Sequence, residues 1–530
     1  MPPPLPPTFQ DSAQLDHFLS RLASGLEVMP HGLAASVDVA HVEPDPRALA
    51  QVPGQAARRF ASLPLRRHGH LLAVAMARPH DLEALQGIGF LTDCTVIPLA
   101  ADPQALEAAL AAHYDYQDDL EVARQLGLDR ERDPEAVAAA DMERLAAQAP
   151  IIRMVNDAIA DAVSRRASDL HLRPGEHGTE LLYRIDDELV PVRRFLPDLL
   201  PALVSRIKVL GRMNLAEHRT AQDGRTTFVL PDGRPVDLRI SVLPSIHGES
   251  VAIRLLDTSQ GLRSLDQIGL SPTDRQRIDD LLAADHGLFL VCGPTGCGKS
   301  TTLYAMLQAL ARQRINILTI EDPVEYRIAS IQQMQVNRPA GFTFASAMRN
   351  FLRHDPDVIM VGEIRDWETA EIAIESALTG HLVLSTLHTN TAATAVTRLL
   401  DLGVEPYLLR ASLLGAMSQR LVRRICPHCR SRTQADPRIA GLLGLPADAP
   451  YWKGRGCAEC EGLGMRGRTA AYELLTVSPG ILPLVRAGAE ADRIHAVAVQ
   501  EGMVPLTATA AAMAARGEIS LEEAFRARTD

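Results

Sequence analysis

Apolar positions along the chain repeat with two periods, one typical of helices and one typical of strands. Ile152, Val155, Ile159 and Val163 lie at helical spacing, which predicts an amphipathic helix from about residue 151. Short runs of apolar and β-branched residues predict strands at 71–76, 94–99, 168–172, 181–185, 226–230, 236–242, 288–292, 316–320, 358–361 and 382–385. Because these strands alternate with helical segments, the pattern predicts an α/β fold.

Changes in this pattern divide the 530 residues into several domains, and the 46% of hydrophobic residues are enough for more than one core. The expected parts are a mobile Pro-rich leader (1–35), a small α/β domain (36–117), a charged, Ala-rich helical linker that tethers without packing (118–148), a second α/β domain (149–258), a central α/β core (259–415), a cysteine module (416–475) and a helical tail (476–530). The sequence therefore predicts a multidomain protein.

Charge and hydropathy narrow the class of partner. The formal net charge of −11 argues against a protein that binds nucleic acid through its phosphates, because such binding depends on basic surfaces. The first seven residues, MPPPLPP, lack the basic and apolar regions of a signal peptide, and no apolar run reaches 18 residues. We therefore expect a cytoplasmic protein whose membrane contacts, if any, are made through protein partners.

A glycine-rich loop between a predicted strand and a predicted helix has the pattern G-x-x-x-x-G-K-[ST], which is typical of phosphate binding. Only three of the 54 basic residues are lysine, and Lys299 occupies the lysine of this pattern, where a compact ammonium fits against phosphate oxygens better than a guanidinium. Ser300 is placed to ligate Mg2+. The residues assigned to the nucleotide are Gly293, Pro294, Thr295, Gly296, Cys297, Gly298, Lys299, Ser300 and Thr301. The alternative is an ordinary turn.

A carboxylate follows the predicted strand 358–361. In a nucleotide-binding fold, an acidic residue at the carboxyl end of a buried strand beside the phosphate loop holds the Mg2+ shell. Glu363 has this position. An isolated strand-terminal glutamate is more often a solvated surface residue, so the assignment depends on the loop at 293–300.

Two more predicted strands are followed by groups that suit ATP hydrolysis. The strand 316–320 is followed by Glu321, which we expect to be the base that orients the attacking water, although this acidic cluster could instead be a turn around Pro323. The strand 382–385 leads to His388, interpreted as a sensor of the γ-phosphate, with a turn residue as the alternative. Four strands ending in polar groups at one sheet edge predict an ATPase site.

Four of the seven cysteines form two C-x-x-C pairs, which can close a tetrahedron of thiolates around a structural Zn2+. These four are Cys426, Cys429, Cys457 and Cys460. Redox-active or idle cysteine pairs are the alternative. Cys94 and Cys292 are interpreted as core residues and Cys297 as a loop filler.

With these motifs in place, the chain resembles secretion ATPases of the type II secretion and type IV pilus assembly superfamily over about residues 150–530. The matching motifs are the Walker A loop (293–301), the aspartate box (320–326), the Walker B segment (355–366) and the histidine box (379–390), together with 167–174, 222–225 and 521–526. The sequence departs from the family pattern at Asp187, Ala221 and His218, which leaves turn geometry in the second domain open.

The resemblance implies a RecA-like P-loop core that binds ATP and Mg2+ in a ring, usually a hexamer. ATP is then expected between this core and the preceding domain, with four arginines neutralising the phosphates. By alignment to the motifs these are Arg239 and Arg254 from the preceding domain and Arg349 and Arg353 from the core.

Within the superfamily, the cysteine module and the N-terminal extension resemble the assembly or secretion branch, most closely the type II secretion ATPases. The resemblance implies pseudopilus assembly, an inner-membrane platform protein as a partner, and docking of residues 36–117 onto the cytoplasmic domain of an inner-membrane secretion protein. A regulatory or spacing role for that domain is the alternative. The rival functions are type IV pilus assembly, a non-hydrolysing nucleotide switch and a nucleic-acid translocase.

Overall fold

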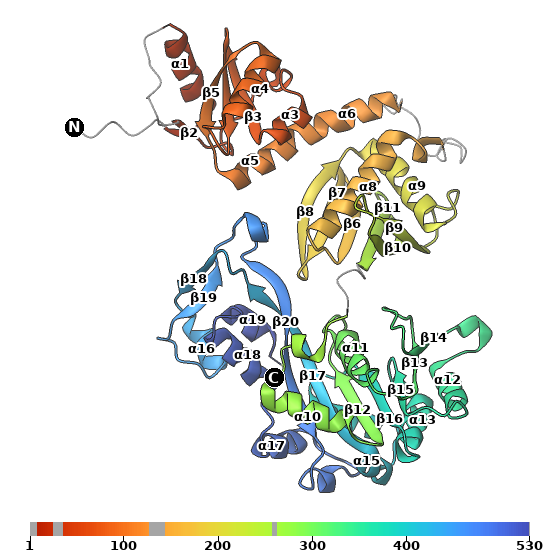
Figure 1. The fold of residues 1–530 in the computed structure, drawn as a ribbon. Helices are drawn as coiled ribbons and strands as arrows, with labels where there is room; N and C mark the ends of the chain where they lie inside the picture. The colour runs from red at the N-terminus through yellow and green to blue at the C-terminus, as the bar shows by residue number, and fades with distance from the viewer. Residues whose placement is uncertain (1–7, 25–34, 127–143, 257–261, 529–530) are drawn as a thin grey trace. The chain divides into compact units, whose positions relative to one another are not determined.

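A computed structural model describes residues 8–24, 35–126, 144–256 and 262–528. The chain forms two compact units, residues 1–259 and 260–530, which are described separately (Figure 1). The prediction of a multidomain α/β protein is confirmed.

The first domain of unit 1 is a five-stranded sheet of order β1-β2-β5-β4-β3, in which only β3 is antiparallel to its neighbour. Its strands are β1 (Thr8–Phe9), β2 (Ala35–Val37), β3 (Ser62–His68), β4 (Leu71–Met76) and β5 (Thr95–Ala100). The helices are α1 (Ser12–Ala23), α2 (Pro46–Leu49), α3 (Gly54–Arg59), α4 (Leu82–Thr92) and α5 (Pro103–Leu110). The fully buried β4 lies at the centre of the core.

The expectation of a weakly patterned leader is wrong for residues 8–24. Helix α1 is capped by Asp11, whose side chain accepts from the Gln14 amide, and it buries Leu15, Phe18 and Leu19 in the core of the first domain. These three residues have helical spacing, a short signal that the proline-rich context obscured. Residues 1–7 and 25–34 lie outside the described part of the chain.

The expected linker also packs over part of its length. After a π-helical turn (Ala111–Asp115), helix α6 runs over Tyr116–Gln125, and its Asp119 is 1% exposed. The Asp119 carboxylate accepts hydrogen bonds from Arg193 Nη2 at 2.5 Å and from the Leu196 amide at 3.3 Å, both in the second domain. Residues 118–125 are therefore a packed helix, whereas 127–143 lie outside the described residues.

The second domain of unit 1 is an antiparallel sheet of order β8-β7-β6-β11-β10-β9. Its strands are β6 (Asp169–Gly175), β7 (Gly178–Ile185), β8 (Glu188–Phe195), β9 (Gln222–Val229), β10 (Pro235–Ser245) and β11 (Gly248–Leu256), with helices α8 (Ala149–Ser164) and α9 (Leu200–Gly211). The predicted amphipathic helix is confirmed as α8, although its buried face includes Ile151 in place of Ile152.

Unit 2 is built on a seven-stranded sheet of order β14-β13-β15-β16-β12-β17-β20, parallel except for the last strand. The strands are β12 (Gly287–Cys292), β13 (Ile317–Glu321), β14 (Gln332–Gln335), β15 (Val358–Val361), β16 (Leu382–Leu387), β17 (Leu413–Ile425) and β20 (Met465–Thr476). Each face of the sheet has its own hydrophobic core. The core on one face includes residues of α12 (Phe344–Phe351), α13 (Trp367–Leu378) and α14 (Ala392–Asp401). The core on the opposite face includes residues of α10 (Pro272–Leu282) and α11 (Lys299–Leu310).

The boundary expected between core and cysteine module at residue 416 is wrong, because β17 and β20 belong to the core sheet. The cysteine module is an insertion between these two strands and carries β18 (Arg430–Thr433), α16 (Pro437–Leu442) and β19 (Tyr451–Gly454). The helical tail is confirmed by α17 (Ala491–Gln500), α18 (Leu506–Ala515) and α19 (Leu521–Arg526). The last of the core helices is α15 (Pro406–Ser412).

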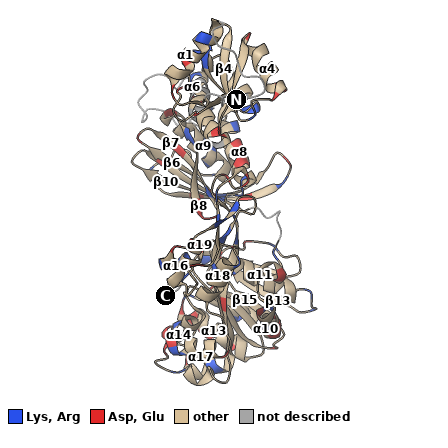
Figure 2. Cartoon of the chain, turned by 90° about the vertical axis from the view of Figure 1, so that its left-hand side faces the viewer, with Lys and Arg blue, Asp and Glu red and all other residues tan. Residues whose placement is uncertain are grey.

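None of the helices in the described ranges combines the length and the apolar character needed to cross a membrane. Figure 2 shows acidic and basic residues interspersed in both units.

Candidate nucleotide site and tetracysteine cluster

Four strands of unit 2 bring the predicted ATPase motifs to one edge of the sheet. Strands β13, β15, β16 and β12 are neighbours and parallel, so their carboxyl ends lie side by side. The phosphate loop follows β12, Glu321 ends β13, Glu363 follows β15 and His388 follows β16. The expectation that four strands end in polar groups at one edge is confirmed.

Three glycines of the phosphate loop have backbone conformations that favour glycine, and two of them, Gly293 and Gly298, are the glycines of the pattern. Gly293, Gly296 and Gly298 have φ values of +138°, +80° and +92°, which favour glycine. A Cβ on Gly293 would lie 2.5 Å from both Cys297 Sγ and the Gln419 carbonyl oxygen, so the loop is packed against its surroundings. Cys292 and Cys297 are buried, as expected for core and filler residues.

Lys299 begins α11 and its ammonium is held inside the loop. Its Nζ donates to the carbonyl oxygens of Gly293 at 2.8 Å and Pro294 at 3.0 Å. Burial lowers the pKa of Lys299, and the nearby cysteines and Glu363 partly offset this effect. The helix N-terminus adds a favourable field for an anion. Ser300 is exposed in the first turn of α11.

Glu363 and His388 are brought together, as the motifs require. The side chain of Glu363 is 13% exposed, and its Oε2 lies 3.5 Å from His388 Nε2 and 2.6 Å from Arg365 Nε. The hydrogen bond to Glu363 raises the pKa of Arg365. Sequence reasoning did not single out Arg365, although it lies inside the matched Walker B segment two residues after Glu363.

Glu321 is buried and its carboxylate accepts three hydrogen bonds. Its Oε1 accepts from Thr319 Oγ1 at 2.7 Å and Gln333 Nε2 at 3.1 Å, while its Oε2 accepts from the Tyr304 hydroxyl. The same hydroxyl accepts from the backbone amide of Glu325 at 3.1 Å. Through the Tyr304 hydroxyl, Glu321 therefore connects α11 with the acidic segment after β13.

The four predicted arginines are placed in two pairs. In unit 1, Arg239 on β10 and Arg254 on β11 are register partners, and Arg254 Nε lies 3.2 Å from Asp169 Oδ1. In unit 2, Arg349 on α12 lies 2.5 Å from Glu368, and Arg353 follows that helix. Arg254 and Arg349 thus pair with carboxylates of the protein itself, and the role of the four arginines at a phosphate stays a prediction.

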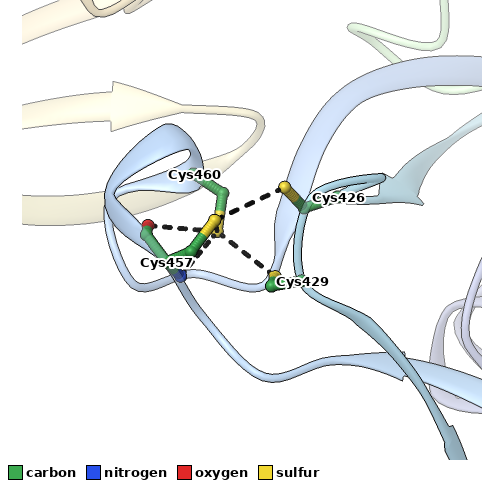
Figure 3. A group of neighbouring side chains, drawn as sticks. All are labelled: Cys426, Cys429, Cys457 and Cys460. Atoms are coloured by element: carbon green, nitrogen blue, oxygen red, sulfur yellow. Dashed lines mark hydrogen bonds between the residues drawn. The ribbon is translucent and has the colours of Figure 1, made fainter.

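The four cysteines of the inserted module converge (Figure 3), and all four Sγ atoms lie within 4.8 Å of one another. Cys426 and Cys457 are 3.8 Å apart, as are Cys429 and Cys460, and Cys457 and Cys460 are 3.7 Å apart. A tetrahedron of sulfurs at about 2.3 Å from a zinc ion has edges of about 3.8 Å. The thiol set therefore fits a closed structural Zn2+ site.

Glycines allow this cluster to form. A Cβ on Gly454 would lie 1.8 Å from the Gly464 carbonyl oxygen, and one on Gly456 would lie 2.5 Å from that of Gly462. The Gly464 amide donates to Cys460 Sγ at 3.2 Å, and the Gly464 carbonyl accepts from the Cys426 amide. Such N–H donors stabilise thiolates, which is what a metal-binding cysteine needs.

Comparison with known families gives two matches. Residues 144–526 match the family described as Type II/IV secretion system protein, and residues 26–120 match the MshEN domain. The first match covers more than half of the chain and includes the phosphate loop, Glu321, Glu363, His388 and the four cysteines.

Curated relatives carry two kinds of name. Type II secretion system protein E of Pseudomonas aeruginosa is 47% identical over 399 residues, covering 73% of this chain and 79% of the relative, and its counterpart in Aeromonas hydrophila is 40% identical over 491 residues, covering 91% and 97%. Type IV pilus assembly ATPase PilB of Thermus thermophilus is 39% identical over 502 residues, which are 93% of this chain but 56% of the relative's length.

Solved structures show the same fold. The pilus retraction motor PilT with bound ADP is 29% identical, with a TM-score of 0.50, and the match covers 71% of this chain and 97% of that chain. The ATPase DotB of Legionella pneumophila has a TM-score of 0.53 at 21% identity, covering 74% and 96%. The RecA-like architecture of unit 2 with a preceding α/β domain is thus shared with known ATPases.

Proposed function

The chain belongs to the Type II/IV secretion system protein family, and on this premise we propose that it is a Mg2+-dependent ATPase that powers pseudopilus assembly and protein export by a type II secretion system. The observation that carries the ATPase part of the proposal is the placement of Lys299, Glu321, Glu363 and His388 at one edge of four adjacent parallel strands, and the type II secretion part is supported by the relatives named type II secretion system protein E. Binding a nucleotide alone would need only the loop.

In this proposal each residue has a separate task. Lys299 exchanges its bonds to loop carbonyls for the β- and γ-phosphate oxygens of ATP, and the loop amides complete the cradle. Ser300 and Glu363 hold Mg2+, which when bound neutralises charge on the phosphates. Glu321 orients the attacking water, and His388, beside Glu363, senses the γ-phosphate.

In the proposal, two pairs of arginines neutralise the phosphates. Arg349 and Arg353 come from the core, and Arg239 and Arg254 come from the preceding domain. Arginine is suited to this task because its guanidinium stays charged and matches phosphate geometry.

We assign the four cysteine thiolates to a structural zinc ion, because the sulfur spacing fits the ion and all four ligand positions are taken by protein. The proposed assembly is a homo-oligomer, a hexameric ring, located in the cytoplasm and recruited to the inner membrane by protein partners. These partners are the cytoplasmic domain of an inner-membrane secretion protein, docked by the N-terminal domain, and the inner-membrane platform protein.

Assembly of a type IV pilus is the second candidate, because PilB relatives match 91–93% of the chain. Deleting the gene in its own organism separates the two. Loss of exported proteins from the medium with pili intact supports type II secretion, and loss of pili with export intact supports pilus assembly. A nucleic-acid translocase is a third candidate, which would show ATP hydrolysis stimulated by DNA or RNA.

A further inference from the structure

Gln419 lies on β17 directly beneath the phosphate loop. Strand β17 pairs with β12 up to Cys292 and Ser418 and then continues beyond the end of β12, so the next residue of β17 meets the loop. Gln419 is 1% exposed. The main-chain carbonyl oxygen of Gln419 is 2.5 Å from where a Cβ on Gly293 would lie, so the loop packs closely against this strand.

Both ends of the Gln419 side-chain amide are used. Its Nε2 donates to the Cys297 carbonyl oxygen at 2.8 Å, and its Oε1 accepts from Thr302 Oγ1 at 2.9 Å. A carbonyl can only accept, which fixes the amide orientation. The amide therefore joins the tip of the loop to the first turn of α11, and it cannot rotate without losing both bonds.

This arrangement sets the direction of a phosphate-binding amide. The C=O and N–H of one planar trans peptide group point to opposite sides. Because the Cys297 carbonyl is held against Gln419, the N–H of Gly298 in the same peptide group points away from β17. The side toward β17 is filled by buried protein, so the opposite side is the one with room for a phosphate.

We propose that Gln419 is a positioning residue for the phosphate site: by holding the Cys297 carbonyl, it presents the Gly298 N–H to the nucleotide. The inference rests on the proposed ATP site and adds to it a group that no phosphate-loop motif contains. Gln419 does not touch the nucleotide, so its loss weakens binding through the loop and leaves the chemical step unchanged.

The test measures affinity, kinetics and stability on the full-length chain. Gln419→Met keeps the volume of the side chain but removes both hydrogen bonds, and it is expected to raise the Kd for a fluorescent ATP analogue and the KM for ATP about 10-fold. The kcat should change less than the KM, since lost ground-state binding raises KM alone. Gln276→Met, at an exposed glutamine bonded to Asp280, is the matched control.

A merely structural role gives a different result, with a lower melting temperature and a smaller active fraction, hence a lower kcat at unchanged KM. That result, or a folded Gln419→Met variant with wild-type Kd, overturns the proposal. If Gln419→Met does not fold, the ATP affinity of Thr302→Val tests the proposal instead. It should weaken binding more than Thr302→Ser, which keeps the hydroxyl, and equal affinities of the two overturn the proposal.

Failure of the proposed function is visible separately. If the wild-type chain itself binds no ATP, the nucleotide site is wrong and the role of Gln419 fails with it. If the wild type binds ATP and Lys299→Ala does not, the site stands, and the Gln419 variants then test the positioning role alone.

Discussion

The hydroxyl of Tyr304 donates a hydrogen bond to the buried carboxylate of Glu321, joining the helix after the phosphate loop to the end of β13. Burial, followed by the negative charge of Glu321, raises the pKa of the Tyr304 phenol. The phenol therefore keeps its proton at physiological pH and remains a donor. This contact fixes the orientation of the acidic group to which we assign the attacking water.

Replacing Glu321 by glutamine is expected to abolish ATP hydrolysis and to spare nucleotide binding, because the amide keeps the shape but cannot accept a proton. Tyr304→Phe should lower kcat less, since the carboxylate remains but loses one of its donors. Steady-state hydrolysis and equilibrium binding measure the two effects. Near-normal turnover by Glu321→Gln would remove the assignment, and a loss in Glu325→Gln would then move the role to Glu325, whose amide bonds Tyr304.

Lys299 should not be replaceable by either alanine or arginine. Alanine removes the ammonium, and the guanidinium of arginine is too wide for a loop whose Gly293 and Gly298 leave little space. Both variants are expected to lose about 100-fold or more in kcat/KM, the scale measured for removal of one charge-stabilising donor. Turnover of Lys299→Arg near that of wild type would contradict this view of the loop.

The cysteine cluster should contain one zinc ion per chain. Metal analysis of the purified protein measures the content, and Cys457→Ser should lower both the zinc content and the melting temperature, because a structural zinc contributes directly to folding. Cys94→Ser, at a buried cysteine remote in sequence from the cluster, is the control for a general cost of replacing a cysteine. A folded wild-type protein without zinc would refute the assignment.

The Asp119 carboxylate should hold α6 against the second domain. Asp119→Asn keeps the size of the side chain but removes the charge that pairs with Arg193 at 2.5 Å. Breaking a buried pair on one side costs about 3 kcal/mol or more, so faster hydrogen exchange is expected in peptides covering Tyr116–Gln125. Unchanged exchange in these peptides would mean that the helix is held by its apolar contacts alone.

The sequence alone predicted where the candidate residues that follow strands would lie in the sheet. The loop that carries Lys299 follows β12, Glu363 and His388 lie within two residues of the ends of β15 and β16, and parallel strands bring their carboxyl ends to one edge. The cysteines were identifiable for a similar reason, because paired C-x-x-C spacing already limits the geometry. In both cases the informative signal lies within a few residues of the functional group.

What the sequence did not reveal depends on contacts between distant residues. Gln419 is 122 residues from Cys297 along the chain, and no local pattern links them. Tyr304 reads as one more buried position of α11, and β17 and β20 were assigned to the cysteine module because the cysteines lie between them. Only the order of strands in the sheet shows that both belong to the core.

The most direct test of the central claim is Mg2+-dependent ATP hydrolysis by the purified full-length chain, compared between wild type and Glu363→Gln. The variant removes the charge of the carboxylate that lies 3.5 Å from His388 and is assigned to the metal. The account predicts hydrolysis by the wild type and loss of turnover in Glu363→Gln with ATP still bound. Equal turnover by the two proteins, or ATP binding without hydrolysis by both, would contradict it.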